Sequence, residues 1–186
     1  MELYQRIIGP AWSSLSDSVQ EFHLTGEKIE MRGQGLFNIR HGSNVMAQLL
    51  ACLMRMPAAG DNVPTELVVT SLNEGERWRR SFAGKTLISD QREQIGNLML
   101  ERFGMLELGF NLAVRDQVLH YQQTRAALRV GTLRVSLPGW LAPRIVASER
   151  AAADRAGVLV SVEIRAPLLG RLMTYTGCIK REGAAS

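Results

Sequence analysis

One short segment of the chain combines residue types that could hold a ligand. Residues 74–84 read EGERWRRSFAG, and in a β-strand their side chains would alternate between two faces. Trp78, Arg80 and Phe82 would then share one face, with the arginine between two aromatic rings. Such an arginine can bind an anionic group in an apolar pocket, because aromatic faces attract cations and supply apolar walls. The segment therefore predicts ligand contacts at these three residues.

A second interpretation of Arg80 stays open. If its face of the strand is buried, the guanidinium needs a carboxylate partner, because an unpaired buried charge is strongly destabilising. Glu101, in the segment LERFG, is the nearest candidate, one or two strands further along the chain. The pair would then fix strand register. In either interpretation Glu101 belongs to the expected site, although a register slip of one residue would exchange the two faces.

Two further aromatic residues are candidates for the same region. Trp140 lies in LPGWLAP, where two prolines predict a rigid loop that is either a lid over a pocket or an exposed corner. Tyr175 lies in an expected strand after the turn 167–170, and its hydroxyl can serve the core or a ligand. We therefore add Tyr175 to the expected ligand-binding residues.

Other chemistry has little support in the sequence. The chain lacks the G-x-S-x-G, P-loop, G-x-G-x-x-G and H-E-x-x-H motifs. Its three histidines, His23, His41 and His120, have no metal-ligand spacing, so we expect packed or surface histidines, no metal and no cofactor. A rival hypothesis is an enzyme in which Glu101 or Glu149 acts as a general base beside Arg80.

The elements that would position these residues belong to an α+β fold. Two short helices are expected within residues 2–24, broken at Gly9-Pro10. Period-two alternation predicts a strand over 27–40, with a bulge or bend at Gly33 and Gly35. The nearly all-round apolar segment Val45–Met56 predicts a helix that is covered on most sides, as a central core element.

After a turn at 58–64, alternating segments with short connections predict a meander of antiparallel strands. Residues 144–157 have helical propensity, but their flanking turns favour a strand. The expected architecture is one domain, residues 1–186, in which a large curved antiparallel sheet forms a half or nearly closed barrel. The N-terminal helices and the apolar helix would pack on its concave face. The other expected strands are Glu66–Leu72, Arg77–Ala83, Thr86–Gln94, Asn97–Phe103, Leu106–Val114, Val118–Val130, Val158–Ile164 and Arg171–Lys180.

Composition limits the function classes. The 186 residues are 46% hydrophobic and 22% charged, which is typical of a globular domain. The net charge of +4 is spread along the chain without a basic cluster, so we expect no nucleic-acid partner. No segment has the length of a transmembrane span or the pattern of a signal peptide. Cys52 and Cys178 lack motif spacing and are expected to be buried thiols in a cytoplasmic protein.

Several of these segments in the same order resemble the bacterial domain-of-unknown-function 4166 family. The residues that carry the resemblance are Trp78-Arg79-Arg80-Ser81-Phe82, Glu101-Arg102-Phe103-Gly104, Leu137-Pro138 with Leu141 and Pro143, and Pro167, Gly170 and Tyr175-Thr176-Gly177. The family has no established function and implies no catalytic residue. Its members are sometimes joined to oxidoreductase domains similar to saccharopine dehydrogenase, which implies an accessory or ligand-holding role. The alanine-rich stretch 151–156 departs from the family pattern.

The leading hypothesis is a non-enzymatic binder of a hydrophobic or lipid-like small molecule, held between sheet and helix. Its expected contacts are Trp78, Arg80, Phe82, Glu101 and Tyr175, and an anionic head group would meet Arg80. One alternative is an accessory or catalytic domain associated with an oxidoreductase. Another is a protein–protein interaction module, including a homo-oligomer, that docks through a sheet edge or the Trp140 loop.

Overall fold

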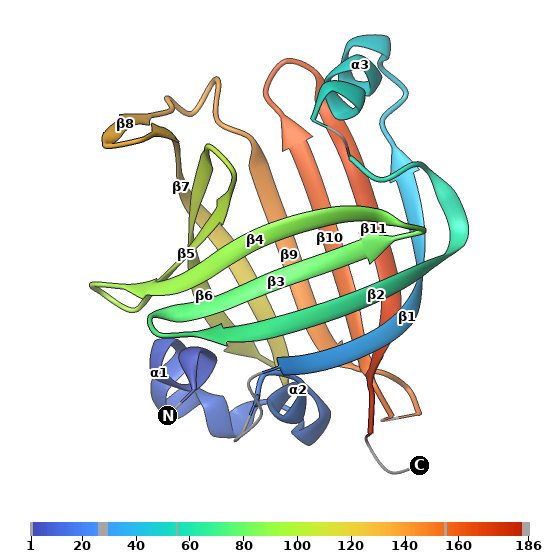
Figure 1. Ribbon diagram of the computed structural model, residues 1–186, viewed down its shortest axis with the longest axis vertical. Coiled ribbons are helices and arrows are strands. Elements are labelled where there is room, and N and C mark those ends of the chain that lie inside the picture. The colour runs from blue at the N-terminus through green and yellow to red at the C-terminus, as the bar shows by residue number, and fades with distance from the viewer. Residues whose placement is uncertain (1, 26–29, 55, 155, 184–186) are drawn as a thin grey trace.

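A single antiparallel sheet winds into a barrel (Figure 1). The structure is a computed structural model and describes residues 2–25, 30–54, 56–154 and 156–183. The sheet has eleven strands in the order β6-β5-β4-β3-β2-β1-β11-β10-β9-β7-β8, and an additional β6–β7 pairing closes it. Closure removes the exposed edges that an open sheet of this size would present. Strand β8 lies outside the closed ring, paired with β7.

Most strands match the sequence expectation. Residues 144–151 form a strand, as the turn chemistry favours, and β2 begins at Gly60 within the expected turn. The short strand 133–136 was not expected. The start of the expected strand at 27–29 lies outside the described residues. The strands are β1 (Glu30–His41), β2 (Gly60–Leu72), β3 (Gly75–Phe82), β4 (Lys85–Gln94), β5 (Leu98–Phe103), β6 (Leu106–Arg115), β7 (Val118–Val130), β8 (Leu133–Ser136), β9 (Arg144–Ala151), β10 (Val158–Ala166) and β11 (Gly170–Arg181).

The expected bulge in β1 lies further along the strand. Its register with β2 shifts between Phe37 and Ile39, not at the two glycines. Gly35 has another reason to lack a side chain, because an added Cβ would lie 2.1 Å from the carbonyl oxygen of Cys178 on β11. The glycine therefore permits close approach of two neighbouring strands.

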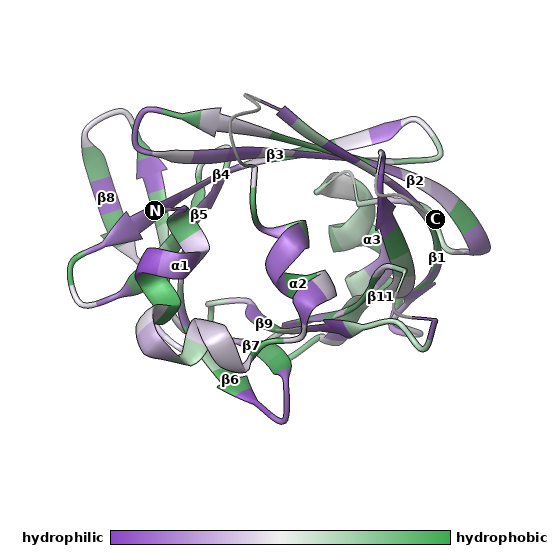
Figure 2. Ribbon diagram, turned by 90° about the horizontal axis from the view of Figure 1, so that it is seen from below, coloured by the Kyte–Doolittle hydropathy of each residue, from purple (hydrophilic) through white to green (hydrophobic). Residues whose placement is uncertain are grey.

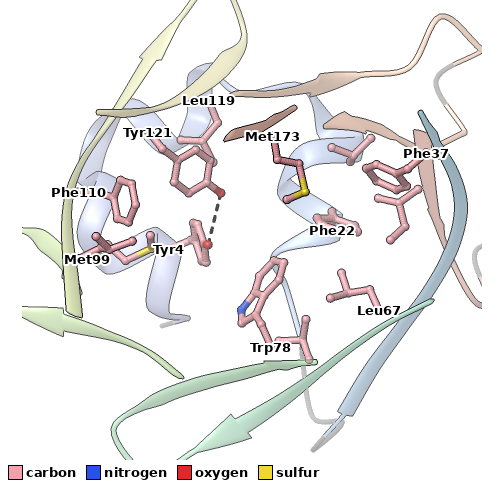
Figure 3. Close-up of a cluster of buried hydrophobic side chains, with 14 of the residues drawn as sticks. Tyr4, Phe22, Phe37, Leu67, Trp78, Met99, Phe110, Leu119, Tyr121 and Met173 are labelled. Carbon is pink, nitrogen blue, oxygen red and sulfur yellow. Dashed lines mark hydrogen bonds between the residues drawn. The ribbon is translucent and has the colours of Figure 1, made fainter. Parts of the chain in front are cut away.

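Three short N-terminal helices close one end of the barrel, called here the plug end. They are α1 (Leu3–Ile8), the 3-10 helix η1 (Gly9–Ser14) and α2 (Asp17–Phe22). Figure 2 views the barrel from this end, with α1 and α2 across the opening. The apolar faces of α1 and α2 are buried, so Tyr4 has no exposed surface and Phe22 is also buried. Figure 3 shows both side chains among the residues of the barrel core.

Helix α3 (Val45–Leu53) lies at the opposite end, called here the open end, beside the start of β11 (Figure 1). The prediction that it is covered on most sides was wrong. Among the helix side chains that the structure describes, only the small residues Ala47 and Ala51, four positions apart, are fully buried, whereas Val45, Met46 and Leu49 are 75%, 56% and 61% exposed. An all-round apolar sequence favours burial but does not say which faces find a neighbour.

The cysteine prediction was also wrong in part. Cys52 is exposed, because it lies on the face of α3 that has no covering element, and Cys178 is half-buried in β11. Both are free thiols. Within the described residues, no helix is long and apolar enough to cross a membrane.

Candidate functional site

The residues predicted from segment 74–84 face the inside of the barrel. Trp78 and Phe82 on β3 are buried at 3% exposure each, and Arg77 and Arg79 point outward. Arg80 lies between the two aromatic residues, with its guanidinium carbon 4.9 Å from the centre of the Trp78 ring. The alternation of a β-strand therefore places the expected side chains on one face, as the sequence indicated.

Arg80 and Glu101 form an ion pair inside the barrel. Arg80 Nη2 lies 3.2 Å from Glu101 Oε1, and the side chains are 18% and 9% exposed. Glu101 is on β5, two strands from Arg80, and Ser89 on the intervening β4 bridges them. Burial by itself lowers the pKa of Arg80, but the charge of Glu101, the nearby Tyr175 and Tyr4 and the hydrogen bond to Glu101 together outweigh this and hold it above its ordinary value. The ion pair that the second interpretation predicted is therefore present.

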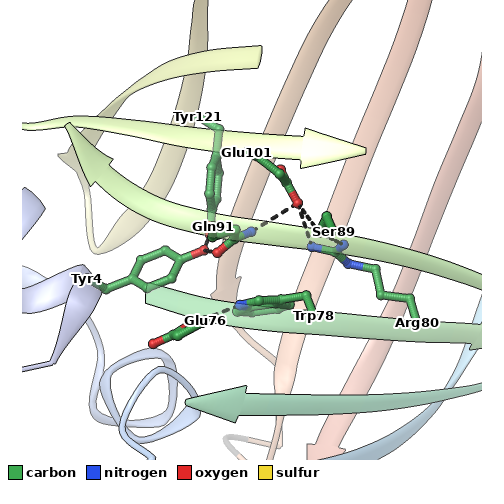
Figure 4. A network of polar contacts seen from close by, with 8 residues as sticks. All are labelled: Tyr4, Glu76, Trp78, Arg80, Ser89, Gln91, Glu101 and Tyr121. Atoms are coloured by element: carbon green, nitrogen blue, oxygen red, sulfur yellow. Dashed lines mark hydrogen bonds and ion pairs between the residues drawn. The ribbon is translucent and has the colours of Figure 1, made fainter. Parts of the chain in front are cut away.

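A chain of polar contacts links this pair to the plug end (Figure 4). Gln91 Nε2 donates to Glu101 Oε1 at 3.0 Å, and the Tyr4 hydroxyl donates to Gln91 Oε1 at 2.8 Å. The Tyr121 hydroxyl donates to that of Tyr4 at 3.3 Å. Burial raises the pKa of both tyrosines well above the ordinary value, so both hydroxyls are protonated donors at neutral pH.

A second buried pair lies next to this chain. His23 Nε2 lies 2.6 Å from Glu149 Oε2, and the His23 ring stacks on Tyr4 with 3.8 Å between ring centroids. Glu149 is therefore held by the end of α2 rather than by Arg80, which lies beside Glu101. Glu76 on β3 accepts a hydrogen bond from the Trp78 indole at 2.9 Å, and burial raises its pKa. The predicted packed histidine is thus observed at His23.

These side chains enclose a cavity of about 120 Å³. All five predicted ligand-binding residues line it: Trp78, Arg80, Phe82, Glu101 and Tyr175. Tyr175 packs against Phe37 and Phe82, and burial raises its pKa to about 12, partly offset by the Arg80 charge. Within the described residues its hydroxyl has no hydrogen-bond partner. The same holds for Glu101 Oε2, since every donor to this carboxylate contacts Oε1.

The exposure of the lining shows where the cavity opens. Its walls near the plug end, among them Tyr4, Phe22 and Tyr121, are buried. Its walls near the open end, among them Leu87 and Ile164, are half-buried. Access is therefore from the open end, near α3.

Some lining residues were not found from the sequence. Tyr4 and Phe22 have a helical amphipathic signal that predicts burial, but nothing in it indicates insertion into a barrel. Gln91 and Tyr121 carry no motif at all. The pairing of His23 with Glu149 spans 126 positions, so it depends on the closure of the sheet. Among the described residues, no cluster of three metal-ligating side chains is present.

The fold and site define a closed antiparallel barrel with an apolar internal cavity, plugged at one end by helices. The family model of the Domain of unknown function (DUF4166) matches residues 15–179, so the chain belongs to this family. The resemblance noted in the sequence is thereby confirmed.

A search of curated proteins finds no match to the chain. One solved structure, an isomerase-inactive variant of GphF DH1, aligns over 98% of this chain and 82% of its own, at 9% identity and a TM-score of 0.17. Likeness at that TM-score carries no argument about fold or function.

Proposed function

We propose that the protein binds a slim hydrophobic or lipid-like small molecule inside the barrel, without chemical conversion. The observation that carries this proposal is the cavity of about 120 Å³, which has apolar and aromatic walls and access at one end. A dry apolar cavity of roughly 150 Å³ can hold a benzene molecule, whereas drug-sized ligands need roughly 300 Å³ or more. The expected ligand is therefore one ring or a short chain, with any longer tail extending through the open end.

The polar atoms of the cavity bear on the head group. The Glu101 carboxylate offsets the Arg80 charge, so an anionic head beside Arg80 would also lie beside Glu101. The Tyr175 hydroxyl and Glu101 Oε2, which lack partners among the described residues, can instead bond an uncharged group such as a hydroxyl. We therefore propose an uncharged polar head in place of the anionic one expected from the sequence.

Calorimetric titration with a series of 1-alkanols tests this proposal. Each added methylene contributes about 0.8 kcal/mol, or about fourfold in affinity, while it enters apolar surroundings. The affinity should rise with chain length and then level off once the cavity is filled. The corresponding carboxylates should bind more weakly, because their charge faces Glu101.

A matched pair of variants separates the cavity from the outer surface. Leu87 lines the cavity, while the adjacent Ile88 lies on the outer face of β4 and is 52% exposed. Leu87→Trp should weaken alkanol binding at least tenfold, and Ile88→Trp should leave it unchanged. Failure of every alkanol to bind, or equal effects of the two variants, would contradict the proposal.

We also make a proposal for the location of the protein and for its partners. The free thiols of Cys52 and Cys178 support a reducing compartment, so we propose a cytoplasmic protein, to be checked by cell fractionation. Mass spectrometry of the protein purified from its own host would reveal a retained small molecule, a second copy or an oxidoreductase partner.

A further inference from the structure

Three arginines lie side by side at the open end of the barrel. In the sheet register Arg165 on β10 is opposite Arg144 on β9, and it is also opposite Arg171 on β11. All three are exposed. They form a ladder of like charges across three neighbouring strands, called here the arginine ladder.

This arrangement is unfavourable for folding by itself. Like charges directly opposite each other in a sheet destabilise it, and opposite charges in the same places would stabilise it. Glu163 pairs with Arg165, but no described acidic side chain forms an ion pair with Arg144 or Arg171. The ladder thus has free positive charge that suits an anionic partner.

Exposed apolar side chains flank the ladder. Trp140 and Leu168 are 66% and 93% exposed, and together with Arg144 and Arg165 they line one surface groove. The Trp140 loop and the β10–β11 turn are both at the open end, as is α3 with its exposed apolar residues (Figure 1). Large apolar side chains beside arginines gain little from a free phosphate ion in water. They gain free energy where a charged head-group layer adjoins hydrocarbon.

We propose that the open end docks on an anionic lipid surface, with the arginine ladder on the head groups and Trp140 and Leu168 in the boundary layer. Tryptophan is the residue that favours this boundary, because its ring is apolar and its N–H is polar. Arginines near an anionic surface add attraction that salt screens. This docking does not depend on the cavity being occupied, although it would place the cavity opening towards the lipid.

Vesicle sedimentation with the full chain tests the proposal. Phosphatidylcholine vesicles containing phosphatidylserine should bind the protein, pure phosphatidylcholine vesicles should bind it much less, and added salt should release it. Each arginine near the surface contributes about fivefold in affinity, so Arg144→Gln with Arg171→Gln should weaken binding about 25-fold. Leu168→Ala should weaken it severalfold.

Matched controls lie away from the open end. Arg150 is exposed on the same strand as Arg144 but at its other end, so Arg150→Gln should bind vesicles as the unmodified protein does. Ile95, in the β4–β5 turn, is 97% exposed, so Ile95→Ala is the control for Leu168→Ala. Thermal melting verifies that each variant is folded, and loss of the ladder should not lower the melting temperature.

Four outcomes would overturn the proposal. The first is that the protein binds neither kind of vesicle. The second is that the variant with Arg144→Gln and Arg171→Gln binds vesicles as tightly as the unmodified protein does. The third is calorimetric binding of inorganic phosphate that needs the arginines but not Leu168, which would assign the ladder to a soluble anion. The fourth is self-association lost in Trp140→Ala without vesicle binding, which would make the surface an interface between two copies.

Discussion

At the plug end of the barrel, ring side chains from α1 and the end of α2 reach into the core and find partners there. Tyr4 contacts Gln91, Tyr121 and His23, and His23 contacts Glu149. At the open end, apolar side chains of α3 and the connecting loops face outward, and arginines stand opposite arginines. The two ends use the same strands, so the difference lies in what covers them. It indicates that the plug end stabilises the fold, whereas the open end leaves apolar and charged side chains exposed.

The largest expected effect is at the plug end. Tyr4→Ala would leave a cavity and remove the donor to Gln91, at a cost of about 3–5 kcal/mol in the free energy of unfolding. Met46→Ala, on the exposed face of α3, should change it by less than about 0.5 kcal/mol. Urea unfolding measures both. Similar losses at the two positions would break the comparison between the ends.

A smaller effect is expected from the arginine inside the barrel. Arg80→Met leaves Glu101 without its cationic partner, and because Arg80 is 18% exposed and Ser89 and Gln91 remain as donors, we expect a loss of about 2 kcal/mol. Arg144→Met, in the ladder, should raise the free energy of unfolding by roughly a few tenths of a kcal/mol, since it removes a like-charge contact. Chemical denaturation of both variants checks the opposite signs. A destabilised Arg144→Met would show that the ladder contributes to folding.

The smallest expected effect is a difference in pH dependence between two buried glutamates. Burial raises the pKa of Glu76, at the plug end, above its ordinary 4.5. Its contribution to stability is therefore complete below pH 4.5 and is lost as the pH rises through the folded-state pKa. The free energy of unfolding of the unmodified protein and of Glu76→Gln should be measured across this pH range. As the pH increases, the unmodified protein should lose stability relative to the variant.

Glu107, near the open end, should behave in the opposite way. Burial raises its pKa, but the hydrogen bond from Arg134 at 2.6 Å and the charges of Arg134 and Arg129 outweigh this and hold it below 4.5. Its contribution is present above pH 4.5 and is lost as the pH falls through the folded-state pKa. The difference in the free energy of unfolding between the unmodified protein and Glu107→Gln, followed into acidic pH, measures this contribution. If the contributions of Glu76 and Glu107 to stability changed with pH in the same direction, the opposite pKa shifts given to the two residues would be contradicted.

Much of the site was predictable because it is local. Alternation along 77–82 predicted the shared inner face of Trp78, Arg80 and Phe82, and the cost of burying a charge predicted the Glu101 partner. The ligand-binding role of these residues stays a prediction, to be tested by the alkanol series. The closed form of the barrel was less predictable, because closure depends on the β6–β7 pairing and on strand tilt, which no local pattern specifies.

The sequence by itself determined the antiparallel meander and the face of each strand, since a period of two and short turns express themselves within a few residues. Only the tertiary structure decided where the apolar helix Val45–Leu53 would lie, which end the N-terminal helices would close, and that His23 would meet Glu149. It also decided the register that places Arg144, Arg165 and Arg171 in one row. Such contacts join distant positions, and their free energy depends on packing of the whole barrel rather than on any one segment.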